Sequence, residues 1–167
     1  MNKKSAIITG ASKGIGSKIA ETLALNGYRI IINYNNSEAD AMRLNDKITA
    51  SGGESYIFKA DIGNYTMAKS LINYCLEKLG TIDILINNAG ISHIKMFTDI
   101  TAEDWDEMIR INLTGVYNTT HNAIKTMIMN KCGKIINISS IWGSTGASCE
   151  VHYSAAKAGV IGFTKAL

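Results

Sequence analysis

A tyrosine and a lysine stand four residues apart near the end of the chain, at Tyr153 and Lys157. On a helix this spacing places both side chains on one face, with Cβ atoms about 5–6 Å apart. A tyrosine by itself exchanges its proton poorly near neutral pH, because the unperturbed pKa of a phenol is about 10. A neighbouring ammonium group stabilises a phenolate, so such a pair can work as a general acid or base. Pairs at this spacing also occur by chance on exposed helix faces, so the surrounding residues must show whether this pair has a chemical role.

Other polar residues follow the apolar runs of the chain. Ser140 comes just after the strand-like run 134–138, and residues 87–90 (Asn-Asn-Ala-Gly) follow the run 82–86. Asn112 lies between apolar neighbours in a helical stretch, where its amide needs hydrogen-bond partners. Each of these could separately be a turn or capping residue. Their combination, in the order that a nucleotide-binding fold needs, indicates a functional site rather than a set of unrelated turn residues.

A glycine-rich run at residues 9–16 joins a strand-like run to a helical stretch. Its glycines stand at positions 10, 14 and 16, which is not the spacing of the commonest dinucleotide fingerprint. A strand that enters a helix through glycines directs backbone N–H groups and the positive end of the helix dipole at one point. The run therefore predicts a phosphate-binding turn, although similar turns also occur where a helix merely packs on a strand.

Strand-like and helical patterns alternate along the whole chain. Strands are predicted at residues 5–9, 29–34, 55–59, 82–86 and 134–138, and helices at 14–26, 37–51, 64–79 and 102–130. Ser37 with Asp40, and Thr101 with Asp104, are candidate helix starts. Strands separated by helices require right-handed crossovers, which make the sheet parallel and cover both faces with helices. We predict one doubly wound, Rossmann-like α/β domain over residues 1–167, with ligands beyond the carboxyl ends of the strands.

Composition excludes several classes of protein. Of the 167 residues, 46% are apolar and 19% charged, which is typical of a soluble globular domain. The formal net charge of +3 is spread along the chain, so nucleic-acid binding is not expected. No apolar stretch is long enough to span a bilayer, and no signal peptide is evident. The three cysteines and three histidines lack metal-ligand spacing, so we expect free thiols, no metal and a cytoplasmic location.

These motifs together resemble those of the short-chain dehydrogenase/reductases, and are most similar to the bacterial 3-oxoacyl-acyl-carrier-protein reductases. The resemblance rests on residues 9–16, residues 87–90, Asn112, Ser140 and the Tyr153–Lys157 pair. It implies reduction of a ketone, either a small molecule or one bound to a carrier protein, to a secondary alcohol. It also implies that Tyr153 donates the proton, Lys157 stabilises the phenolate and holds the nicotinamide ribose, Ser140 bonds the substrate oxygen, and Asn112 holds a water of the proton relay.

The same resemblance implies a set of cofactor-binding residues: Gly10, Ala11, Ser12, Lys13, Gly14, Ile15, Gly16, Asp61, Ile62, Asn88, Ala89, Gly90, Tyr153 and Lys157. Asp61 is expected to meet the adenine. The segment 33–37 has no acid for a ribose 2′-OH, and Lys13 could reach a 2′-phosphate. NADPH is therefore expected in preference to NADH, although Lys13 could also be a solvated loop lysine.

Two features depart from the family pattern. The chain ends within the helix that carries Tyr153, whereas family members continue with further strands and a segment that covers the substrate. From this we expect the chain to be a fragment that lacks the C-terminal strands. We expect the full-length protein to be a homo-oligomer. The alternative is that the chain is a non-catalytic nucleotide-binding module. Glu150 is the second departure, because an acid is less expected beside a neutral acyl chain. With residues 141–143 it resembles reductases of a 5-aminopentanone attached to elongation factor P, although Glu150 could simply be a surface carboxylate.

Overall fold

The computed structural model describes residues 3–167. Five parallel strands form one sheet in the order β3-β2-β1-β4-β5. The strands are β1 (Ser5–Ile8), β2 (Arg29–Tyr34), β3 (Glu54–Lys59), β4 (Ile84–Asn87) and β5 (Lys134–Asn137). The order reverses beside β1, and such a reversal opens a crevice at the carboxyl ends of the strands. The prediction of a doubly wound parallel α/β fold is confirmed.

Helices cover both faces of the sheet because successive strand residues point to opposite sides. Ala6 and Ile8 of β1 pack in one core cluster, whereas Ile7 packs in the other. The first cluster lies under α1 (Gly14–Leu25) and α2 (Glu38–Ala50), and the second under α3 (Tyr65–Leu79) and α5 (Gly115–Met129). Burial on both faces explains why the central strands are almost continuously apolar.

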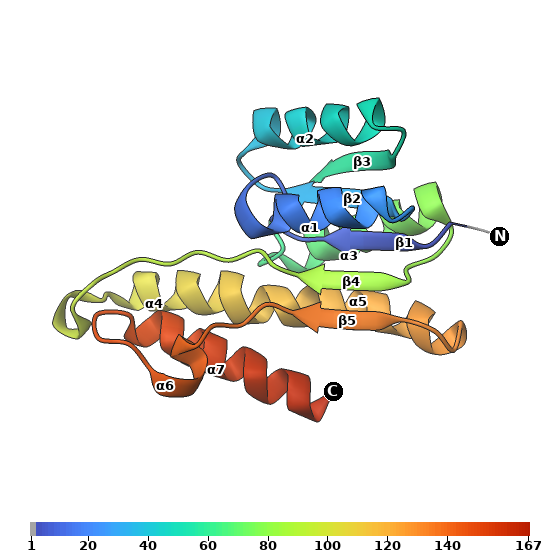
Figure 1. The fold of residues 1–167 in the computed structure, drawn as a ribbon. Coiled ribbons are helices and arrows are strands. Elements are labelled where there is room, and N and C mark those ends of the chain that lie inside the picture. Colours follow the sequence, from blue (N-terminus) through green and yellow to red (C-terminus); the bar gives the residue numbers. More distant parts are fainter. Residues whose placement is uncertain (1–2) are drawn as a thin grey trace.

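Three further helices begin at the carboxyl ends of the strands, and the last of them runs back beside β5 (Figure 1). They are α4 (Ala102–Ile109), the short α6 (Trp142–Thr145) and α7 (Val151–Ala166), and a 3₁₀ turn, Phe97–Asp99, precedes α4. Helix α7 packs against both α4 and α6. Figure 1 shows the chain leaving β4, running out past the sheet edge and returning through α4, so that this end extends from the sheet.

Both predicted helix starts are confirmed, but of the two residues Thr101 alone caps its helix with its side chain. The Thr101 side chain accepts from the backbone N–H of Asp104, and the Asp104 side chain accepts in return from the Thr101 N–H. Ser37 precedes α2 but makes no capping hydrogen bond with its side chain. Its ψ of 63° lies outside the extended region in which capping side chains usually reach back to the helix.

The long helix predicted over residues 102–130 is interrupted. A π-helical segment, Arg110–Thr114, separates α4 from α5. At its centre, Asn112 turns its side chain inward and bonds to the backbone of Ile91. One extra residue per turn is tolerated where a side chain gains such contacts, and π-segments of this kind often occur at functional sites.

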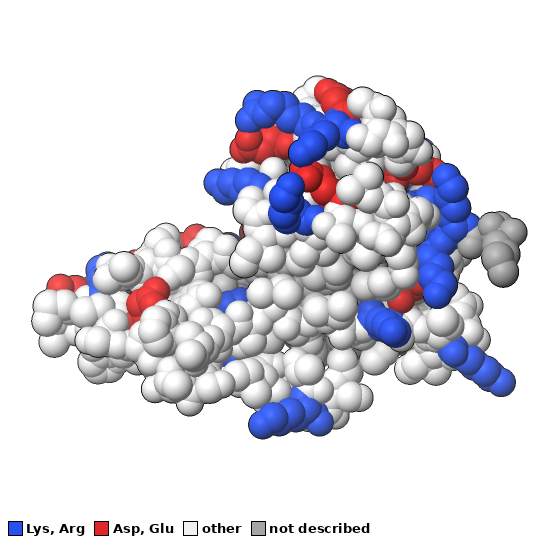
Figure 2. All heavy atoms as spheres, in the orientation of Figure 1, with Lys and Arg blue, Asp and Glu red and all other residues white. Residues whose placement is uncertain are grey.

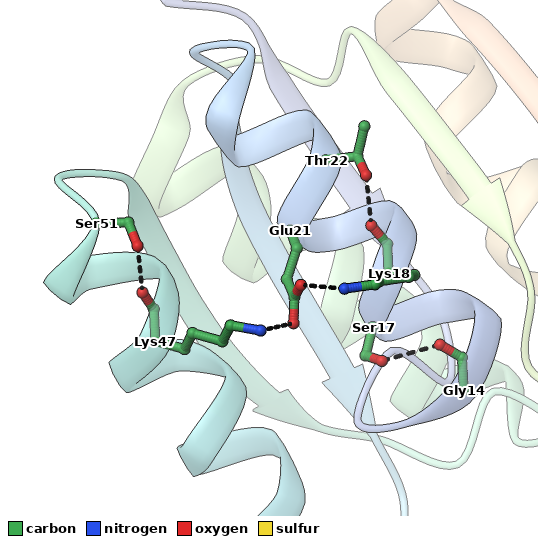
Figure 3. Close-up of polar contacts among 7 residues, drawn as sticks. All are labelled: Gly14, Ser17, Lys18, Glu21, Thr22, Lys47 and Ser51. Atoms are coloured by element: carbon green, nitrogen blue, oxygen red, sulfur yellow. Dashed lines mark hydrogen bonds and ion pairs between the residues drawn. The ribbon is translucent and has the colours of Figure 1, made fainter.

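Away from the strand ends, α1 and α2 are joined by an ion-pair bridge. The Glu21 carboxylate accepts from Lys18 Nζ at 3.0 Å within α1 and from Lys47 Nζ at 2.8 Å on α2 (Figure 3). Both lysine side chains are mostly exposed. Within residues 3–167, no helix is both long and apolar enough to cross a lipid bilayer.

Candidate active site at the carboxyl edge of the sheet

Two glycines of the 9–16 turn stand where larger residues would not fit. Gly10 has φ +60°, and a Cβ there would lie 2.7 Å from Ala89 Cα. A Cβ on Gly16 would lie 2.5 Å from the side-chain nitrogen of Asn88. The glycines thus let the turn between β1 and α1 press directly against the segment that follows β4.

Side chains at the carboxyl ends of three strands hold this turn in place. Asn88 Nδ2 donates to the carbonyl oxygens of Thr9 and Gly10, at 2.9 and 3.1 Å. Thr9 Oγ1 accepts from the backbone N–H groups of Asn88 and Ala89, both at 3.0 Å. From β2, the buried Asn33 accepts from Gly10 N–H and donates to the carbonyl of Ala60 beyond β3. The polar groups around the turn therefore satisfy one another.

A groove runs along the strand ends in front of this frame. Its lining is drawn from the glycine turn, the carboxyl ends of β2, β3 and β4, helix α4 and the π-segment: Gly10, Ser12, Lys13, Ile15, residues 33–37, 60–62 and 88–91, Glu107, Arg110 and Ile111. Most of the predicted cofactor-binding residues are therefore brought together. Ala11 and Gly16 are instead buried beneath the turn. Gly14, which is exposed, is not part of this lining either, nor are Tyr153 and Lys157.

Asp61, predicted to meet an adenine, projects from the chain just after β3. Its Oδ1 accepts from Gly63 N–H at 2.9 Å, and its Oδ2 accepts from Arg110 Nη1 at 2.7 Å. Arg110 was not among the predicted site residues. The available signal was a charged side chain between two isoleucines, two positions before Asn112.

Asn112 is fully buried in the π-segment. Its Nδ2 donates to the carbonyl oxygens of Ile91 and Met108, at 3.0 and 3.1 Å, and its Oδ1 accepts from Ile91 N–H at 3.1 Å. The side chain therefore fixes the segment that follows β4 to the helix that precedes α5. The predicted role of Asn112 in a proton relay stays a prediction.

Tyr153 and Lys157 lie on one face of α7, as their spacing predicts. Lys157 Nζ is 5.7 Å from the centre of the Tyr153 ring. The lysine is 4% exposed and donates to the carbonyl oxygen of Ile138 at 2.8 Å. Burial lowers the pKa of Lys157, because desolvation disfavours its charged form. Among residues 3–167, the half-buried Tyr153 has no hydrogen bond at its hydroxyl.

The two serines after β5 have different surroundings. Ser139 Oγ donates to the carbonyl oxygen of Lys157 at 2.9 Å, which ties the strand end to α7. Ser140 Oγ instead accepts from Trp142 N–H at 3.2 Å, at the start of α6. A hydroxyl that accepts one hydrogen bond keeps its own proton for another partner. Ser140 is therefore the serine whose hydroxyl proton is available to a further acceptor.

Comparison with known proteins identifies the family. The model of the short chain dehydrogenase family matches residues 4–167. This chain belongs to the short-chain dehydrogenases. It is 43% identical over 160 residues to a 3-oxoacyl-[acyl-carrier-protein] reductase of Synechocystis sp., covering 96% of this chain and 65% of the relative. It is 39% identical over 162 residues to a reductase of the same name from Staphylococcus aureus strain Mu50, covering 97% and 66%. The chain thus spans just under two thirds of the length of these relatives.

In this short-chain dehydrogenase, the motifs used for the sequence resemblance meet at one end of the sheet. Within residues 3–167, no group of three or more His, Cys, Asp or Glu side chains forms a metal site. Cys75 is buried, and its pKa is raised to about 12 by desolvation, which makes it unsuited to nucleophilic chemistry. The chemistry available here is that of a phenol, an ammonium group and a hydroxyl.

Proposed function

We propose that this chain carries the active site of an NADPH-dependent oxidoreductase that reduces a ketone to a secondary alcohol. The observation that carries the proposal is the arrangement around Tyr153: a buried ammonium group beneath its ring, and a serine hydroxyl at the neighbouring strand end with its proton available. Both lie at the same edge of the sheet as the groove lined by the glycine turn.

The groove suits a dinucleotide. Glycines bring bare backbone to the start of α1, where N–H groups and the helix dipole favour phosphate. Asp61 stands at the far side as an acceptor for the adenine amino group, and residues 88–90 line the adenosine side. The bound cofactor would supply a hydride. The chain itself binds, orients and moves protons.

The preference for NADPH is supported by the polar lining near the end of β2. Asn35, Asn36 and Ser37 stand where an acid would bond a ribose 2′-OH, and Lys13 lines the same groove with its side chain exposed. Ser37 leaves the first N–H groups of α2 without a side-chain cap. A 2′-phosphate would meet a helix amino end and a lysine there.

Proton handling follows from the three side chains. As charge develops on the substrate oxygen, the Ser140 hydroxyl can donate a hydrogen bond to it and Tyr153 can transfer its proton. The ammonium of Lys157 stabilises the phenolate left behind. Lys157 is held by the Ile138 carbonyl, and it forms no ion pair with an acidic side chain within residues 3–167. Asn112 is proposed to complete a proton relay through a water.

For the substrate we propose a 3-oxoacyl group on a carrier protein, on the basis of the names of the two relatives. With it we propose a cytoplasmic homo-oligomer. The decisive experiment compares Tyr153→Phe with the unaltered chain, following NADPH oxidation with a 3-oxoacyl thioester. We expect turnover to fall by about 10²–10⁴-fold with NADPH binding retained.

A matched control is Tyr74→Phe, since Tyr74 of α3 packs on Phe58 of β3 and is not part of the groove lining. This variant should keep full activity. Turnover by Tyr153→Phe at the unaltered rate would refute the proposal. Cofactor binding without turnover by the unaltered chain would instead favour the nucleotide-binding module.

A second substrate, a ketone with an ammonium group, is favoured by Glu150. Its carboxylate accepts from the Ser92 hydroxyl at 2.6 Å directly before α7, and it pairs with no Lys or Arg within residues 3–167. In the face drawn in Figure 2, Lys and Arg gather around α1, α2 and the amino ends of the strands, and few appear at the opposite end. The 5-aminopentanone of modified elongation factor P would be such a substrate.

Glu150→Gln distinguishes the two substrates. For an amine-bearing ketone the variant should raise KM, whereas for a neutral 3-oxoacyl thioester it should leave KM unchanged. Equal KM values for the amine-bearing ketone in both proteins would remove the case for the second substrate.

A further inference from the structure

Arg110 reaches across the groove from the first residue of the π-segment to Asp61, which follows β3. The two residues are 49 positions apart in sequence, and Arg110 Nη1 lies 2.7 Å from Asp61 Oδ2. Both side chains line the groove and are partly exposed, at 40% for Arg110 and 25% for Asp61. An ion pair this exposed contributes little to folding stability, so its position in the groove calls for another explanation.

Gly63 provides a second, independent indication. Its backbone N–H donates to the other carboxylate oxygen, Asp61 Oδ1, at 2.9 Å. A Cβ on Gly63 would collide with Arg110 Nη1 and lie 3.1 Å from its Cγ and Cζ. The arginine stem thus lies directly over the Gly63 backbone, and the absence of a side chain at position 63 lets it do so.

These contacts hold each oxygen of the carboxylate from a different side. A carboxylate has about four lone-pair positions, so one bond to each oxygen leaves room for a further donor. The guanidinium also offsets the negative charge of Asp61, which would otherwise repel an anionic ligand. A fixed, neutralised carboxylate is a specific acceptor for an exocyclic amino group on a purine.

We propose that Arg110 is a positioning residue for the adenine end of the cofactor. Arg110 holds the Asp61 carboxylate in the orientation that accepts a hydrogen bond from the adenine amino group. Because Gly63 has no side chain, the arginine can pass over its backbone to reach Asp61. This inference rests on the proposed function, because it assumes that an adenine dinucleotide occupies the groove.

The test compares NADPH with its hypoxanthine analogue, in which a carbonyl oxygen replaces the amino group. The unaltered chain should bind NADPH about tenfold more tightly than the analogue, because a site built for an N–H donor rejects a ligand that lacks it. Arg110→Met keeps the stem and removes the guanidinium. It should bring the two dissociation constants to within about twofold, raising KM for NADPH with kcat unchanged.

Two further variants separate orientation from charge and folding. Gly63→Ala keeps both charged groups but displaces the arginine. The ratio of the dissociation constants of the analogue and NADPH should therefore also fall, by about threefold. Arg43→Met removes an exposed arginine that pairs with Asp40 on α2, outside the groove, and should leave the preference intact. Thermal unfolding of each variant, followed by circular dichroism, checks the fold.

The two proposals fail in different ways. An unchanged ratio of dissociation constants in Arg110→Met would overturn the role of Arg110 while leaving NADPH binding and the proposed function standing. The role of Arg110 is likewise overturned if that variant weakens the binding of both nucleotides by an equal factor. If the unaltered chain binds neither nucleotide, the proposed function fails, and the role of Arg110 fails with it.

Discussion

The proposed nucleotide side of the site, around the glycine turn, and its proposed catalytic side, around Tyr153, use hydrogen bonds in opposite ways. Around the glycine turn, Thr9, Asn33 and Asn88 are bonded to the backbone of neighbouring segments, and Thr9 and Asn33 are almost fully buried. On the catalytic side, Tyr153 and Ser140 are half-buried, and within residues 3–167 the Lys157 side chain makes one hydrogen bond, to the Ile138 carbonyl. Around the glycine turn, these polar side chains are already bonded to the protein itself. The catalytic side leaves proton donors available to a ligand.

This difference separates stability from activity. Polar groups that satisfy one another in a buried frame are costly to disturb, since each orphaned partner keeps its desolvation penalty. Groups that face a substrate contribute little to folding, so their replacement should affect turnover more than unfolding. Three substitutions and one control variant test this contrast.

The largest effect is expected from Lys157→Met on the catalytic side. Turnover should fall by about 10²–10⁴-fold, because no ammonium group remains to stabilise the phenolate. The fold should survive, since methionine fills similar space and the buried charge is removed. NADPH oxidation measures the first effect and urea unfolding the second.

The pH dependence of this variant has a definite sign. Burial lowers the pKa of Lys157 in the folded state, so the unfolded chain binds more protons between the folded and the ordinary lysine pKa. The unaltered protein should therefore gain free energy of unfolding relative to Lys157→Met as the pH rises through that window. A relative loss over the same range would contradict the assignment of desolvation as the cause.

A smaller effect, on stability, is expected from Thr9→Val on the nucleotide side. The change keeps the shape but leaves the N–H groups of Asn88 and Ala89 without their acceptor, which should cost about 2–3 kcal/mol. Urea unfolding measures the loss.

Thr22→Val is the matched control. On the exposed side of α1, the Thr22 hydroxyl donates to the Lys18 carbonyl (Figure 3), so its loss should cost under about 0.5 kcal/mol. If the two valine variants lose the same free energy of unfolding, the hydrogen bonds around the turn contribute no more to stability than an exposed helix hydroxyl does.

The smallest effect is expected from Glu21→Gln, which removes the bridge between α1 and α2 (Figure 3). Bridges to exposed lysines contribute less than about 1 kcal/mol and weaken with salt. The pKa of Glu21 is lowered mainly by its hydrogen bond to Lys47, then by that to Lys18.

A depressed carboxyl pKa stabilises the fold above the unfolded pKa and loses that contribution as the pH falls through the folded value. The difference between Glu21→Gln and the unaltered chain should therefore be present at neutral pH and vanish in acid. Thermal melts at two pH values measure it, with catalytic turnover at neutral pH expected to be equal in both. A difference that grows in acid would show that the bridge acts by some other means.

Much of the fold was predictable because it depends on local pattern. The alternation of apolar runs identified five strands close to their observed bounds, and the glycines between them marked the turns. Thr101 and Asp104 form the capping box because both partners lie within one helical turn. The Tyr153–Lys157 pair was predictable for the same reason, since the helix alone sets its geometry.

Other features depend on contacts between distant parts of the chain. The helix break at Asn112 requires Ile91, 21 residues earlier, and the carboxylate of Asp61 finds its arginine 49 residues away. Which of Ser139 and Ser140 keeps its hydroxyl proton available also depends on where α7 lies, because Ser139 donates to a carbonyl of that helix. The amino-acid sequence by itself determined the elements and the chemical groups they carry, because periodicity and short-range spacing are local properties. Only the tertiary structure decided which groups are already bonded and which remain available, because that depends on packing between segments far apart in the chain.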